Sequence, residues 1–265
     1  MTFQPVIPLS GYAGWLFLER TADSQRAVFN ESATVVRATD NFREKIGEIT
    51  TAEDLVNDRE LLGVALGAFG LDDDIDNTFF IKKILEEGTE DSDSLANKLS
   101  DSRYAAFSEA FGFGTLGDLP KTSLSYFADD IIDRYEAKQF EAAVGEQDND
   151  MRLAMNAETA IADVIEASST NDGQWFGMMG NAALRSVFDT AFGFSDSFAA
   201  LDLDQQLEQF QSRAKATFGT DQFSELASAE NQEKMTRLYM LRTEIEANSA
   251  MTSGASIALS LLQQG

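Results

Sequence analysis

Three short stretches of the sequence repeat Ala-Phe-Gly followed by an apolar residue: ALGAFGL at residues 65–71, SEAFGFG at 108–114 and DTAFGFS at 189–195. Before each glycine, apolar side chains recur four residues apart, as a helix with one buried face requires. Glycine adopts the left-handed conformation that ends a helix without steric cost, and the apolar residue after it folds back onto the last turn. The stretches therefore predict helix ends at Gly70, Gly112 and Gly193.

The rest of the chain favours the same class of structure. Its only prolines are Pro5, Pro8 and Pro120, so most of the 265 residues are free of residues that interrupt helices. Apolar residues recur mainly at spacings of three and four, which is the period of helices and not of strands. We therefore expect an all-α fold, a multi-helix bundle.

Two segments, near residues 50–113 and 178–246, share an order of elements. In each, a helix that ends at the repeated stretch is followed by a second helix, a polar linker and a third helix. An internal duplication and a chance recurrence of helix ends both explain this likeness. We expect two similar three-helix units joined by a long central helix within residues 123–166, either continuous or broken near GEQDND (145–150).

The expected organisation is one all-α domain over residues 1–246, with two lobes at about 11–113 and 178–246, followed by a tail at 247–265. The lobes flank the helical spine at 123–166. Residues 16–46 also have the apolar spacing of one long helix. After it, Thr50 and Glu53 have the spacing of a capping box, in which each side chain binds the backbone of the other residue.

The composition excludes several classes of function. The chain has no Cys and no His, which removes disulfides, the usual zinc sites and Ser–His or Cys–His catalysis. Its net charge of −25, from 45 acidic and 20 basic residues, opposes binding to nucleic acid or to an anionic membrane and favours a basic partner. No apolar run approaches the ~20 residues of a membrane span. We expect no cofactor and no membrane span.

One acidic stretch has part of a calcium-loop pattern. Asp72, Asp74 and Asp76 match the first three ligand positions of an EF-hand, but Asn77 replaces the required Gly and Lys83 the required Glu. We therefore interpret the stretch as the acidic N-terminus of a helix and expect no metal site. GEQDND is likewise interpreted as a solvated kink, the alternative being a cation site.

Two apolar stretches have either of two interpretations. GYAGWLFLER, which contains Trp15 and Phe17, is either a docking patch or the start of a core helix. QWFGMMGN, which contains Trp175, Met178 and Met179, offers the soft apolar surface of a partner site or fills a core. Core packing is the favoured interpretation of both, and the partner site stays open as the functional alternative.

The tail ends on an apolar segment that something should bury: another protein, a second copy of the chain, or a groove on its own surface. Several of its residues stabilise a helix poorly: Ser249, Thr252, Ser253, Gly254 and Ser256. The phrase ALSLLQQG (258–265) is similar to the C-terminal end of bacterial flagellins, although the N-terminus does not resemble a flagellin. The expected partner-binding residues in the tail are Ile257, Leu259, Leu261 and Leu262.

A wider likeness covers about residues 5–242. The stretches PVIPLSGYAGWLFLERT, TTAEDLVNDRELLGVALGAFGLDDDIDNTFFIKKILEEGT, FEAAVGEQDNDMRLAMN and LDLDQQLEQF together resemble a bacterial family known as domain of unknown function 1217. Its members are often encoded among flagellar genes. The resemblance therefore implies a link to flagellar assembly, and it implies no catalytic residues.

We expect a non-enzymatic structural or interaction protein with a protein partner in flagellar assembly. The alternatives are an acidic export chaperone and an enzyme that uses carboxylates alone, for which Asp129 and Asp133 share one helical face. An exposed apolar groove would favour the chaperone, and converging carboxylates would favour the enzyme. Because no secretory signal is visible, we expect the cytoplasm or export by the flagellar route.

Overall fold

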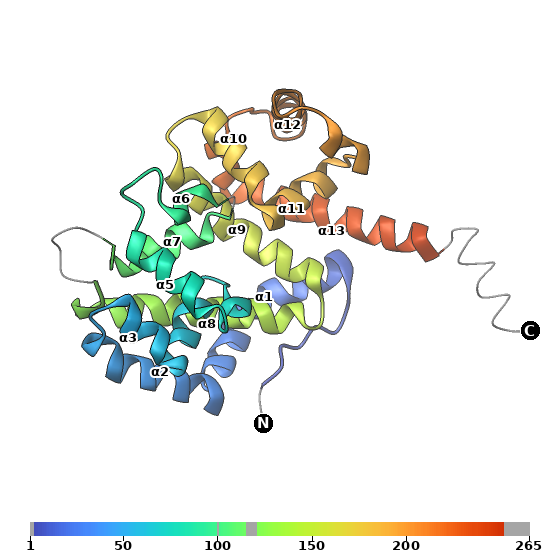
Figure 1. Ribbon diagram of the computed structural model, residues 1–265. Coiled ribbons are helices and arrows are strands. Elements are labelled where there is room, and N and C mark those ends of the chain that lie inside the picture. The colour runs from blue at the N-terminus through green and yellow to red at the C-terminus, as the bar shows by residue number, and fades with distance from the viewer. Residues whose placement is uncertain (1–2, 100, 115–120, 252–265) are drawn as a thin grey trace, which may run out of the picture. The chain divides into compact units, whose positions relative to one another are not determined.

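The computed structural model describes residues 3–99, 101–114 and 121–251, and in these ranges the fold is all-α, without strands (Figure 1). The chain divides into two compact units, each built from two segments. Unit 1 comprises Met1–Val6 and Thr21–Val144, and unit 2 comprises Ile7–Arg20 and Gly145–Gly265. No helix in the part of the chain that the structure describes is both long and apolar enough to cross a membrane.

Helix α1 (Gly11–Asn30) begins in unit 2 and ends in unit 1. The further helices of unit 1 are α2 (Ala33–Lys45), α3 (Ala52–Asn57), α4 (Arg59–Gly67), α5 (Thr78–Glu87), α6 (Leu95–Lys98), α7 (Arg103–Phe111) and α8 (Phe127–Gly145). Short 3-10 helices separate some of them: η1 (Ile46–Glu48), η2 (Asp72–Asp74) and η3 (Lys121–Ser123).

Unit 2 holds the remaining helices. They are α9 (Asn149–Ala167), α10 (Asn171–Gly180), α11 (Ala182–Phe192), α12 (Leu203–Phe218) and α13 (Ala229–Met251), with η4 (Asp196–Ala200) and η5 (Phe223–Ala227) between them. Its core is an aromatic cluster around Trp175 of α10. The Trp175 ring lies with its centroid 5.0 Å from that of Phe223, 5.9 Å from that of Phe188 and 6.1 Å from that of Phe210.

The core of unit 1 gathers apolar side chains from α2 to α8. Its aromatic part lies where α7 packs, because the Phe111 ring is 5.0 Å from that of Phe107 and 5.1 Å from that of Phe127. Phe69, at the end of the first repeated stretch, packs edge-on against Phe107 at 5.4 Å. The repeated stretch therefore supplies core residues to unit 1 as well as a helix end.

The three predicted helix ends are confirmed. Gly70, Gly112 and Gly193 have φ angles of 66°, 70° and 68°. The first and third ends each form the two backbone bonds of a Schellman motif. At the first, Leu71 N–H donates to Leu66 O at 3.0 Å and Gly70 N–H to Gly67 O at 3.2 Å. At the third, Phe194 N–H donates to Asp189 O at 2.9 Å and Gly193 N–H to Thr190 O at 3.0 Å. At Gly112 a single bond to Ser108 O, 3.0 Å long, makes the simpler left-handed cap.

Of the two alternatives for the spine, the structure has the one broken near GEQDND: Asp148 caps the start of α9 by accepting from Met151 N–H at 3.1 Å. Two other expected helix boundaries differ from the structure. The long helix expected over 16–46 is interrupted after Asn30, and α2 begins after Ser32. The capping box lies one residue further on than expected: Thr51 and Asp54 exchange its two bonds, at 3.0 and 3.1 Å.

Candidate functional site

The acidic stretch after α4 directs its carboxylates to different partners in unit 1. Asp72 accepts from Gln139 Nε2 of α8 at 2.8 Å. Asp74 accepts from Tyr104 Oη of α7 at 2.6 Å and from Asn77 Nδ2 at 2.7 Å. Asp76 forms an ion pair with Arg59 of α4 at 2.7 Å, with both side chains exposed. Each carboxylate thus ties this stretch to another element or stiffens the stretch itself.

This arrangement is not that of a calcium loop, in which the same carboxylates converge on one cation. In the described ranges no group of three or more Asp or Glu side chains is placed to hold a metal ion. The expected capping of the next helix by these aspartates is not seen, because the residue at the start of α5 is Asn77 and it forms no side-chain cap. The stretch instead holds α4, α7 and α8 of unit 1 together.

Tyr104 and Arg103 extend this polar network along the start of α7. Burial and the hydrogen bond to Asp74 raise the pKa of Tyr104 to about 12, since both favour the neutral phenol. Arg103 donates from Nη1 to the carbonyl oxygen of Gly70 and from Nη2 to Asp101 at 2.7 Å. Burial acts to raise the pKa of Asp101, but the hydrogen bonds from Arg103 outweigh it and leave that pKa below its usual value. Arg103 thereby fastens α7 to the end of the first repeated stretch.

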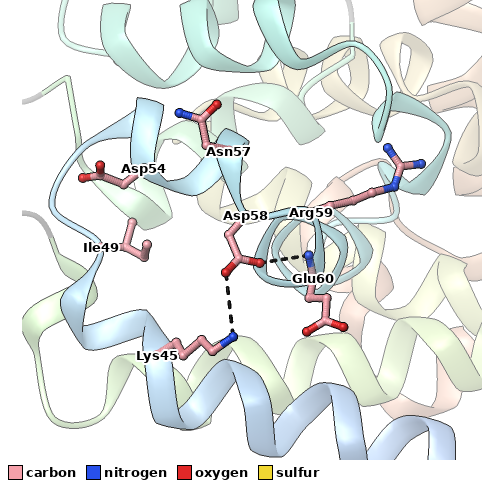
Figure 2. A pocket seen from close by; sticks show the side chains of 7 residues that line it. All are labelled: Lys45, Ile49, Asp54, Asn57, Asp58, Arg59 and Glu60. Atoms are coloured by element: carbon pink, nitrogen blue, oxygen red, sulfur yellow. Dashed lines mark hydrogen bonds and ion pairs between the residues drawn. The ribbon is translucent and has the colours of Figure 1, made fainter.

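An open hollow of about 500 Å³ lies beside the junction of α3 and α4 (Figure 2). Two of its carboxylates, those of Asp54 and Asp58, take part in helix capping. Asp58 accepts from the backbone N–H groups of Glu60 and Leu61 at 3.0 and 3.1 Å, and its second oxygen lies 4.0 Å from Lys45 Nζ. The lining residues are Lys45, Ile49, Asp54, Asn57, Asp58, Arg59 and Glu60. We assign the polar groups of the hollow a structural role.

The two apolar stretches predicted as core or docking sites are mostly buried. Trp175 and Met178 are fully covered, and Met179 nearly so. The indole Nε1 of Trp175 donates to Asp221 O at 3.0 Å, which satisfies its one polar atom inside unit 2. Trp15 is also buried, and Phe17 is half-buried. Trp15, Trp175, Met178 and Met179 therefore pack in the core, whereas Phe17 keeps part of its surface exposed.

Two of the remaining carboxylate candidates, Asp150 and Asp129, also have structural partners. Asp150, in the GEQDND stretch, accepts from Tyr239 Oη at 3.1 Å. Burial and the nearby Asp150 raise the pKa of Tyr239, which is enclosed in unit 2. Asp129 forms an ion pair with Arg43 of α2 at 3.2 Å. The kink expected at GEQDND thus serves to begin α9 and to anchor α13.

The end of α13, in unit 2, carries two large apolar side chains that are exposed on the same helix. Tyr239 and Met240 are buried, whereas Leu241 is 42% exposed and Ile245 is 59% exposed. In Figure 1 the last turns of α13, coloured red, extend past α11. The spacing of four between these two residues is visible in the sequence, but their exposure is not. The predicted tail residues Ile257, Leu259, Leu261 and Leu262 lie outside the described residues.

Three comparisons relate the chain to known proteins. A crystal structure of an Agrobacterium tumefaciens protein has a similar fold, with a TM-score of 0.74 and 25% sequence identity. The likeness covers 92% of this chain and 99% of the bacterial one. The sequence matches none of the curated proteins. A family model described as "Protein of unknown function (DUF1217)" matches residues 68–235.

Proposed function

We propose, for a chain that belongs to the DUF1217 family, a non-enzymatic role as an interaction protein in flagellar assembly. The contact surface is the outward side of α13 around Leu241 and Ile245. The protein partner presents an amphipathic helix to this side, and the tail after Met251 adds to the contact.

A single observation carries this proposal: α13 has apolar side chains on two of its sides. Met235, Tyr239 and Met240 are buried in unit 2, while Leu241 and Ile245 remain exposed one turn apart. A surface helix ordinarily has one apolar side, with polar residues opposite. Burying a leucine or isoleucine side chain contributes about 1.5–3 kcal/mol, so covering this side favours association. Helix docking uses anchors at this spacing.

The flagellar part of the proposal rests on the sequence. The tail phrase ALSLLQQG is similar to flagellin C-termini, and it begins seven residues after Met251, the last residue of α13. The net charge of −25 favours a partner of basic character, because long-range attraction speeds the encounter of opposite charges. Long-range repulsion between like charges would oppose a partner that is equally acidic. Such a partner would need a contact surface without charged side chains.

Capture from lysates of flagellated cells tests the proposal. The full chain is compared with a chain that lacks residues 248–265 and with Ile245→Glu, and bound proteins are identified by mass spectrometry. Leu203→Glu is the matched control, because Leu203 of α12 is 60% exposed, close to the exposure of Ile245. Flagellar proteins should be captured by the full chain and the control and be lost with both other variants. Equal capture by all four chains, or no flagellar protein with any, would contradict the proposal.

A further inference from the structure

We draw no further inference here: the strongest candidate, the exposed apolar side of α13 at Leu241 and Ile245, belongs to the contact surface already proposed, and nothing in the part of the chain that the structure describes shows what covers it.

Discussion

Asp58 and Asn181 occupy equivalent positions in the two units. Asp58 ends α3 and begins α4, and Asn181 ends α10 and begins α11, with extended backbones of similar φ and ψ. Each accepts from the backbone N–H three residues on, Leu61 at 3.1 Å and Leu184 at 3.0 Å. In both units the second helix then ends at a repeated stretch with a Schellman motif. This correspondence supports an internal duplication, which stays a prediction.

Removing either cap should cost a similar amount of stability. Asn181→Ala and Asp58→Ala should each lower the free energy of unfolding by about 1 kcal/mol, because the first N–H groups of the following helix lose their acceptor. Urea unfolding followed by circular dichroism measures the change. Asn181→Asp, which keeps the acceptor, is the control. An unchanged midpoint for both alanine variants would mean that these helices begin without their caps.

Gly193 should tolerate substitution poorly. Its φ of 68° strains any residue with a side chain, so Gly193→Val should destabilise the protein by about 1–2 kcal/mol or more. A Cβ there would also meet the flexible guanidinium of Arg242, 2.9 Å away. In contrast, Gly63 lies inside α4 with open space around it, so Gly63→Ala should stabilise by roughly 1 kcal/mol. Equal effects of the two substitutions would refute the conformational explanation.

Calcium should produce no saturable transition. Asp72, Asp74 and Asp76 have separate partners, and the stretch lacks both the glycine and the bidentate glutamate of a calcium loop. Titration calorimetry at millimolar calcium should show only weak heats that grow without saturation. A one-to-one isotherm with micromolar affinity would contradict this prediction.

Stability should fall at alkaline pH partly through Tyr104. Its pKa rises from about 10 to about 12 on folding, so the folded state retains the phenol proton more strongly than the unfolded chain. The stability that Tyr104 contributes is therefore complete below about pH 10 and is lost as the pH rises through about 12. Tyr104→Phe should be less stable than the wild-type protein at neutral pH, because Asp74 loses its hydrogen-bond donor. Between about pH 10 and pH 12, Tyr104→Phe should lose less stability than the wild-type protein, because it has no phenol proton to release. Urea unfolding at each pH measures the free energy of unfolding of both proteins. An equal loss of stability in the two proteins at alkaline pH would exclude a contribution of Tyr104 to that loss.

Removal of residues 248–265 should leave the fold unchanged. The side chains from Glu244 to Ser249 are exposed, so the last turns of α13 add little to the packing of unit 2. The melting temperature and the helical signal per residue should stay close to those of the full chain. Loss of the cooperative melt would show that the tail belongs to the core.

Local backbone rules predicted the helix ends, because Gly70, Gly112 and Gly193 owe their φ angles to the residue type itself. Those rules were less accurate where two neighbours compete. Thr50 and Thr51 are both suitable caps, and the structure pairs Thr51 with Asp54 while Glu53 binds Lys82 of α5. That choice depends on a residue distant in the sequence, which a local pattern does not contain.

The candidate site was harder to predict because burial depends on tertiary packing. Trp175 and Met178 have the composition of a partner site, but the phenylalanines that cover Trp175 come from α11, α12 and η5. Leu241 and Ile245 have ordinary helical spacing, and only the packing of Tyr239 and Met240 reveals that they face outward. The sequence shows that the acidic stretch lacks two ligand positions of a calcium loop, while its contacts with α4, α7 and α8 required the structure.

The division of unit 2 into two separate segments has a consequence for how the protein is made. Residues 7–20 emerge from the ribosome early and contain Trp15 and Leu18, both buried in the finished fold. The rest of unit 2 begins at Gly145, so this segment must stay without its partners until the second half of the chain has been translated. Unit 1 can fold before unit 2, because its residues 21–144 are translated before the second segment of unit 2.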